Sequence, residues 1–227
     1  MATNNSINLK AQGVPYYDGA GTFTAANTAT AGQMLQSGAN TTPTWSTATY
    51  PATAGSSGNI LTSDGTNIVS SSMINVNTGG VTIPTQPAFL AYLDATQSNK
   101  SGTGTLYTLG TNALTEVFDQ GNDFVTSGTF TAPVTGKYQL SVGMTWVGCT
   151  IATSGSAVIS TSNRSYQFTN SRPAGTSDIN ITGSCLCDMD AADTAIVQVY
   201  STGEAGDTDD VLGQAAVETF FSGYLAC

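Results

Sequence analysis

The side chains that could do chemistry in this chain of 227 residues are carboxylates and thiols, because the sequence contains no histidine. Histidine general bases, Ser-His triads and histidine-ligated metals are therefore excluded. Acidic side chains gather in two stretches, Asp188, Asp190 and Asp193 and then Glu204, Asp207, Asp209 and Asp210. Paired carboxylates can hydrolyse glycosidic bonds, but nothing in the sequence indicates a sugar cleft, so we expect no enzyme.

The second acidic stretch is a candidate calcium site. Ca²⁺ prefers several oxygen ligands, and Glu204, Asp207, Asp209 and Asp210 place four carboxylates in one short segment. Their spacing is not that of an EF-hand loop. The alternative is a solvated acidic turn that binds nothing. Calcium is the one cofactor that the sequence leaves open, and no other is expected.

The four cysteines are Cys149, Cys185, Cys187 and Cys227, and their spacing fits no zinc pattern. A bridge between Cys185 and Cys187 would close a strained ring. We expect free thiols in a reducing compartment. A bridge from Cys149 to Cys185 or Cys187 is the alternative.

The composition predicts β-structure and excludes several partners. The chain has 37 Thr and 23 Ser, and its 5 basic and 15 acidic residues give a net charge of −10. Thr, Val, Tyr and Phe favour strands, whereas Gly and Asn favour turns. So few cations argue against nucleic-acid binding, and no apolar run is long enough to insert in a membrane. Residues 1–10 lack signal-peptide features, so we expect the cytoplasm of the cell that makes the chain, without signal-peptide secretion.

The chain divides by charge into two parts. Residues 1–85 carry a net charge of −1 and five aromatic residues, whereas residues 86–227 carry −9 and 14 aromatic residues. Pro84 and Pro87 disfavour a regular element across the boundary. We expect a segment poor in apolar residues over 1–85 and one ordinary folded domain over 86–227.

The first part contains an internal repeat. Residues 32–37 (GQMLQS) return as 58–63 (GNILTS), 26 residues later, and residues 29–32 (ATAG) return as 52–55, 23 residues later. Each copy predicts a strand, a polar turn and a second strand. Such a hairpin has too few apolar side chains to bury alone and must stack on something. We expect neighbouring chains to pack about a symmetry axis with Leu35, Trp45, Leu61 and Ile68 at the centre; the alternative is a flexible linker.

These blocks, with Pro43-Thr-Trp45-Ser46, resemble repeats of bacteriophage tail fibres and related virion fibre proteins over about residues 29–70. The resemblance implies a virion structural protein whose N-terminus docks to other tail or capsid proteins. It implies an attachment segment over 1–28, a shaft over 29–85 and a head over 86–227. Tyr16, Tyr17 and Phe23 would then be the attachment residues. The alternative is that they belong to a third shaft repeat.

The second part predicts a two-sheet antiparallel sandwich, a jelly roll. Residues 136–147 place Tyr138, Leu140, Val142, Met144 and Trp146 on one face at a period of two. Further strands are expected at 88–93, 104–109, 124–125, 128–130, 157–161, 165–169, 178–183, 194–200 and 218–225.

Residues 87–225 resemble the C1q-like domain, a head related to the tumour-necrosis-factor fold. The resemblance rests on Pro87–Ala91, on the spacing of Phe130, Gly136 and Tyr138 that follows Phe118–Phe124, and on the closing segment Thr219–Leu225. Leu140 and Val142 stand where the family usually has aromatic residues, and no collagen-like stalk precedes the head. The resemblance implies a homotrimer.

Adjacent Phe220 and Phe221 must point to opposite faces of a strand. One can enter the core, and the other would need a partner subunit; a monomer with one exposed ring is the alternative. The residues expected in the head core or in trimer packing are Phe89, Phe130, Tyr138, Phe220, Phe221 and Tyr224.

We therefore expect a homotrimeric virion fibre whose head binds a host surface receptor or glycan. A cell-made adhesin with the same head is the alternative, and a polysaccharide depolymerase is disfavoured. The receptor-binding residues are not predicted. The long polar segments 154–156, 170–177 and 202–211 are candidate loops.

Overall fold

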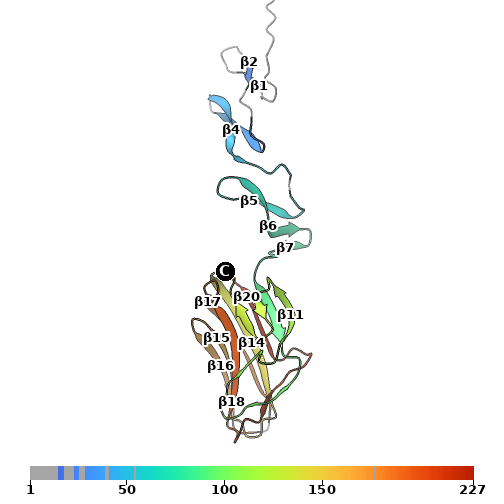
Figure 1. The fold of residues 1–227 in the computed structure, drawn as a ribbon, viewed down its shortest axis with the longest axis vertical. Helices are drawn as coiled ribbons and strands as arrows, with labels where there is room; N and C mark the ends of the chain where they lie inside the picture. Colours follow the sequence, from blue (N-terminus) through green and yellow to red (C-terminus); the bar gives the residue numbers. More distant parts are fainter. Residues whose placement is uncertain (1–14, 18–22, 26–28, 39–40, 54, 176) are drawn as a thin grey trace, which may run out of the picture. The chain divides into compact units, whose positions relative to one another are not determined.

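The computed structural model describes residues 15–17, 23–25, 29–38, 41–53, 55–175 and 177–227. The chain forms two compact units, Met1–Pro84 and Thr85–Cys227, which divide close to the predicted boundary. The described residues form strands and no helix, so the predicted all-β class is confirmed (Figure 1). Accordingly, no helix among these residues is long and apolar enough to span a membrane.

The first unit is a series of small antiparallel sheets. β1 (Pro15–Tyr17) pairs with β2 (Phe23–Ala25), and β3 (Gln33–Gly38) pairs with β4 (Thr41–Thr49). β5 (Asn59–Ser63), β6 (Ile68–Asn77) and β7 (Gly80–Thr82) form a three-stranded sheet.

The internal repeat is visible in the hydrogen bonds of the first unit. The N–H of Tyr50 donates to Gly32 O at 2.7 Å, and 26 residues later the N–H of Val76 donates to Gly58 O at 2.7 Å. Gly32 and Gly58 have φ values of +87° and +89°, a region that favours glycine. The two copies are linked because Asn67 Oδ1, in the second turn, accepts bonds from the Thr49 N–H and hydroxyl.

The second unit is a sandwich of two antiparallel sheets. The first sheet has the order β12 (Phe124–Val125), β13 (Thr129–Thr131), β18 (Thr194–Thr202), β15 (Ser154–Thr161), β16 (Ser165–Ser171), and β10 (Tyr107–Thr108) also pairs with β18. The second has the order β11 (Thr115–Gln120), β8 (Ala88–Tyr92), β20 (Phe220–Leu225), β14 (Gly136–Val147), β19 (Asp209–Val211), β9 (Gln97–Ser101), and β17 (Ile179–Met189) also pairs with β14. From β13 to β19 the chain crosses between the two sheets at every step except β15–β16, a two-sheet arrangement typical of a jelly roll.

The core lies between the sheets and is built from alternate residues of each strand. Tyr138, Leu140, Val142, Met144 and Trp146 of β14 are all buried, as their period of two predicts. At one end, Phe89 stacks on Phe124 and Phe130 with ring centroids 4.8 Å apart and meets Phe221 edge-on. This aromatic cluster joins both sheets.

The two ends of the sandwich differ. The first and last segments of the unit meet at one end, where the N–H of Leu225 donates to Pro87 O and Gln86 Nε2 donates to Leu225 O. The connections β14–β15, β16–β17 and β18–β19 therefore lie at the opposite end, because β14 runs away from its start beside Leu225. We call these three connections the distal loops.

Candidate interaction surfaces

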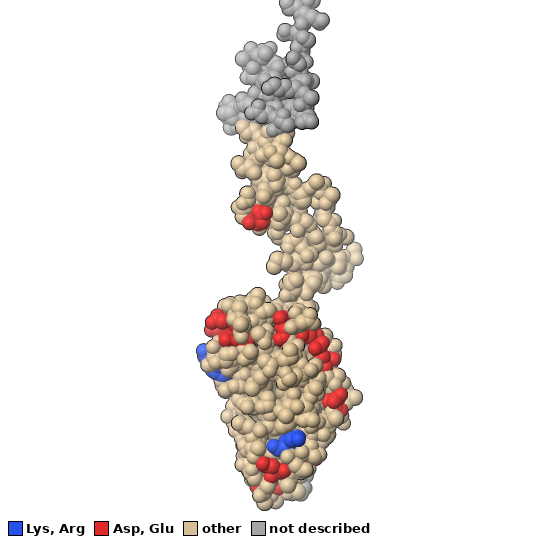
Figure 2. Space-filling model, in the orientation of Figure 1, with Lys and Arg blue, Asp and Glu red and all other residues tan. Residues whose placement is uncertain are grey.

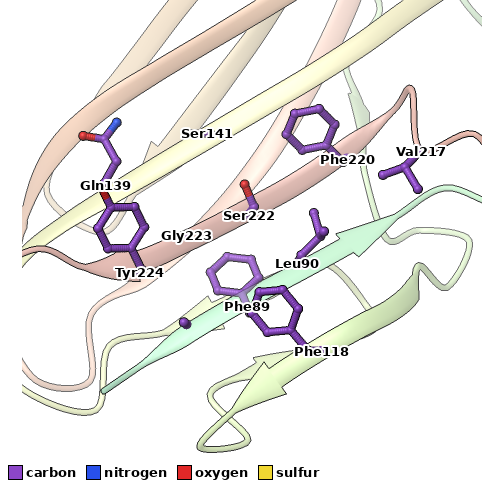
Figure 3. A pocket seen from close by; sticks show the side chains of 11 residues that line it. Phe89, Leu90, Phe118, Gln139, Ser141, Val217, Phe220, Ser222, Gly223 and Tyr224 are labelled. Carbon is purple, nitrogen blue, oxygen red and sulfur yellow. The ribbon is translucent and has the colours of Figure 1, made fainter. Parts of the chain in front are cut away.

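The outer face of the second sheet carries an apolar hollow of about 620 Å³. It forms because β20 alternates, with Phe221 in the core and Phe220, Ser222 and Tyr224 on the outer face. Figure 3 shows the lining side chains, which come from strands β11, β8, β20 and β14 and, for Val217, from the segment before β20. We call this surface the outer hollow; it is lined by Ala88, Phe89, Leu90, Phe118, Gln139, Ser141, Val217, Phe220, Ser222, Gly223 and Tyr224.

Large rings are exposed to water in the outer hollow. The side chains of Phe118 and Tyr224 are 48% and 50% exposed, and the Phe220 ring lies over Gly143, where a Cβ would come within 2.4 Å of it. Covering such a side chain fully gains about 1.5–3 kcal/mol. The lining contains no charged residue. The outer hollow is therefore suited to bind an apolar protein surface.

The six predicted head residues divide between two environments. Phe89, Phe130, Tyr138 and Phe221 are in the core, and the Tyr138 hydroxyl donates to Val134 O at 2.8 Å. Phe220 and Tyr224 are on the outer face. Sequence reasoning missed Phe118, because its strand β11 was not predicted.

The four acidic residues of the candidate calcium site lie in different surroundings, and calcium binding there stays a prediction. The Glu204 carboxylate accepts bonds from the N–H groups of Thr150, Ile151 and Ala152 and from the Thr150 hydroxyl. Burial raises the pKa of Glu204, but these donors outweigh it and hold the pKa below its usual value. This carboxylate fastens the β18–β19 loop to the β14–β15 loop.

The carboxylates of Asp207 and Asp210 accept hydrogen bonds from two different segments, and that of Asp209 accepts none. Asp207 accepts bonds from Thr103 and Thr105, and Asp210 Oδ1 accepts from the N–H of Asn99. Asp209 is fully buried in β19. The Ser201 hydroxyl and the Cys149 thiol lie near its carboxylate, but neither carboxylate oxygen has a partner in hydrogen-bond geometry. Among the described residues, no group of three or more His, Cys, Asp or Glu side chains could hold a metal ion.

Burial raises the pKa of Asp209 above its usual value, and the nearby Glu204 charge acts in the same direction. The Ser201 hydroxyl, the Cys149 thiol and Arg172 oppose that shift.

Burial likewise raises the pKa of Cys149 to about 12. Cys149 follows the far end of β14, whereas Cys185 pairs with Leu140 inside the strand, so this register excludes the predicted alternative of a Cys149 bridge.

The distal loops contain two of the three predicted loop segments. The N–H of Arg172 donates to Thr153 O, and the N–H of Thr153 donates to Thr202 O, so segments 170–177 and 202–211 meet there. Residues 154–156 are instead the first residues of β15. Figure 2 shows that acidic residues are spread over the visible face of the second unit and do not form one patch.

In the first unit, apolar side chains are exposed to water. Of the predicted shaft residues, Leu35 and Leu61 are 39% and 56% exposed, whereas Trp45 and Ile68 are half-buried. Leu35 pairs with Trp45 across the β3–β4 hairpin. Sequence reasoning missed Met73 and Val81, which are 65% and 66% exposed.

The predicted attachment residues lie in the first hairpin. Tyr16 and Tyr17 belong to β1 and Phe23 to β2, and the backbone of Tyr17 pairs with that of Phe23. Their side chains lie outside the described part of the structure.

No family model matches the sequence, and no curated protein sequence matches it. Similar solved structures include the globular domain of zebrafish complement 1qA protein, at 16% identity and a TM-score of 0.44, over 62% of this chain and 98% of that chain. Murine APRIL matches at 10% identity and a TM-score of 0.44 over the same shares. The Eiger TNF from S. frugiperda matches at 14% and 0.40, over 62% and 94%. The jelly-roll assignment of the second unit rests on the strand order and register given above.

Proposed function

We propose that this chain is a non-enzymatic, homotrimeric virion fibre whose second unit binds a host surface receptor or glycan. The observation that carries the proposal is the uncharged outer hollow, in which the Phe118 and Tyr224 rings are exposed and the Phe220 ring is half-buried. The fibre-type repeat of the first unit supports the virion assignment. The N-terminal segment would contact other tail or capsid proteins.

The partner that fits the outer hollow is a second copy of this chain. With a net charge of −10, copies repel one another over most of their surface. The outer hollow contains no charged residue, so copies can meet there without that repulsion. Three copies around one axis would cover all three rings.

The distal loops are the proposed contact with the host. They lie opposite the end where the head joins the first unit, and contacts such as that of Glu204 with the β14–β15 loop fix their geometry. In a trimer, three identical weak sites would gain strength through effective concentration.

Sedimentation velocity of the full chain tests the trimer. We expect a single trimeric species, and we expect Phe118→Asp to give a monomer because it places a charge in the outer hollow. Val125→Asp is the matched control, since Val125 is 54% exposed on β12 of the other sheet. A monomeric parent chain, or a trimer that Phe118→Asp leaves intact, would contradict the proposal.

Electron microscopy with antibodies against the chain tests the virion assignment. We expect label on virus particles from a producing culture. Label confined to the surface of uninfected cells would instead support the cell-made adhesin. Release of sugars from purified host polysaccharide would support the depolymerase.

A further inference from the structure

Cys185 and Cys187 form a closely spaced thiol pair on β17. Their Sγ atoms are 3.3 Å apart, which is too far for a disulfide bond and close enough for an S–H···S hydrogen bond. They are two residues apart in the strand, so both side chains point to the same face. Among the described strands, β17 pairs only with β14.

The two thiols differ in exposure and in acidity. Cys187 is fully buried, whereas Cys185 is partly exposed. The S–H group of Cys185 donates to a Cys187 thiolate and holds the pKa of Cys187 below its usual value, with help from the Tyr166 hydroxyl and Arg164. The same bond raises the pKa of Cys185. The pair therefore loses its first proton easily and its second with difficulty.

We propose that Cys185 and Cys187 are a redox-modification site that a small-molecule disulfide such as oxidised glutathione converts into an intrastrand disulfide. The shared proton moves to Cys187, and the exposed Cys185 thiolate attacks one sulfur of the reagent and releases one reagent thiolate. Cys187 then loses its proton to water and attacks the Cys185 sulfur, which releases the second reagent thiolate. Two electrons pass from the cysteine pair to the reagent, which leaves as two thiols.

The disulfide is strained, and this makes it reversible. Residues two apart in a strand have Cα atoms about 6.6 Å apart, at the upper end of the disulfide range, whose usual value is about 5.5–6 Å. Closing the bond therefore contracts the strand at Leu186, whose backbone pairs with Gln139 of β14. A ring this small gains little from restricting the unfolded chain, and strained disulfides are easily reduced.

The test uses the full chain with Cys227→Ser, which removes the exposed thiol that would react without any special geometry. After incubation with oxidised glutathione, mass spectrometry should show loss of two hydrogens, no retained glutathione, and a link inside the tryptic peptide 165–227, which follows Arg164 because trypsin does not cleave between Arg172 and Pro173. Dithiothreitol should restore both thiols without denaturant. The oxidised chain should melt a few degrees lower than the reduced chain.

Two further variants assign the roles of the sulfurs. Adding Cys187→Ser should leave one glutathione attached to Cys185, because the resolving thiol is absent. Adding Cys185→Ser should leave the buried Cys187 unmodified. Cys149, which is buried and has a raised pKa, should stay free in all samples. Two free thiols after incubation, stable glutathione on Cys185 with Cys187 present, or a bond that resists dithiothreitol would each overturn the proposal.

Discussion

Two carboxyl groups five residues apart affect the stability of the fold in opposite directions. Glu204 accepts four hydrogen bonds in the distal loops, and its pKa is lowered. Asp209 is buried without a hydrogen-bond partner for either oxygen, and its pKa is raised. A carboxyl group whose pKa is lowered by folding stabilises the folded state at pH values above its usual pKa, where it is ionised. A carboxyl group whose pKa is raised by folding destabilises the folded state in the same pH range.

Replacing Glu204 with Gln should destabilise the second unit at neutral pH. Hydrogen bonds to charged groups are worth about 1.5–3 kcal/mol, and solvent exposure reduces the expected loss to about 1 kcal/mol. The loss should shrink as the pH falls through the folded pKa of Glu204, because the parent carboxylate is then protonated as well. Urea unfolding at several pH values measures this, and a constant difference down to acidic pH would contradict it.

Replacing Asp209 with Asn should have the opposite effect. At neutral pH the buried charge destabilises the parent chain, so the variant should be more stable by about 1 kcal/mol. The gain should shrink as the pH falls toward the usual carboxyl range of about 4, where the parent carboxyl is neutral. Asp210→Asn is the control, because Asp210 accepts one N–H bond that an amide oxygen can also accept. An equal gain in the control would show that burial of Asp209 is not the cause.

Periodicity predicts the strands that bury one face and misses the polar strands. The alternation of Tyr138 to Trp146 was enough to predict β14 and its core side. β9 has the sequence QSNKS and β19 has DDV, so neither shows an apolar alternation. They are strands because Asp209 pairs with Ser101 and Val211 pairs with Gln97, contacts between distant segments that local sequence does not reveal. The burial of Asp209 was missed for the same reason, since its neighbours in sequence are typical of an exposed acidic turn.

In the first unit, the repeated hairpin depends on glycines that permit a close backbone approach. A Cβ on Gly32 would lie 2.5 Å from Tyr50 O, whereas a Cβ on Gly65 would meet nothing within 4 Å. Both residues have positive φ, at +87° and +95°. The two positions therefore separate backbone strain from steric contact.

Gly32→Ala should destabilise the first unit more than Gly65→Ala. The strain of a left-handed alanine costs about 1 kcal/mol at either position, and the contact with Tyr50 O adds to it only at Gly32. Thermal unfolding of the full chain, followed by circular dichroism, measures both variants against the parent. Equal shifts would mean that the hairpin tolerates a wider turn at Gly32.

For the whole molecule, the exposed apolar residues of both units lead to one expectation about assembly. The second unit has its own core and an outer hollow that suits self-association. The first unit has no comparable core among its described residues, and Leu61, Met73 and Val81 are all more than half exposed. If copies of the chain cover these side chains, both units contribute to trimer stability.

Removing the first unit should therefore weaken the proposed trimer without unfolding the head. A chain of residues 85–227 should remain folded, because every strand of its two sheets lies within that range. Its trimer should dissociate at a higher protein concentration than that of the full chain, because burial of apolar side chains in the first unit adds to association. Sedimentation equilibrium over a dilution series measures the dissociation constants of the fragment and of the full chain. The full-chain variants Leu61→Ser and Val81→Ser should have dissociation constants between these two. Equal dissociation constants for the fragment and the full chain would show that residues 29–84 are a linker and that the head alone holds the trimer together.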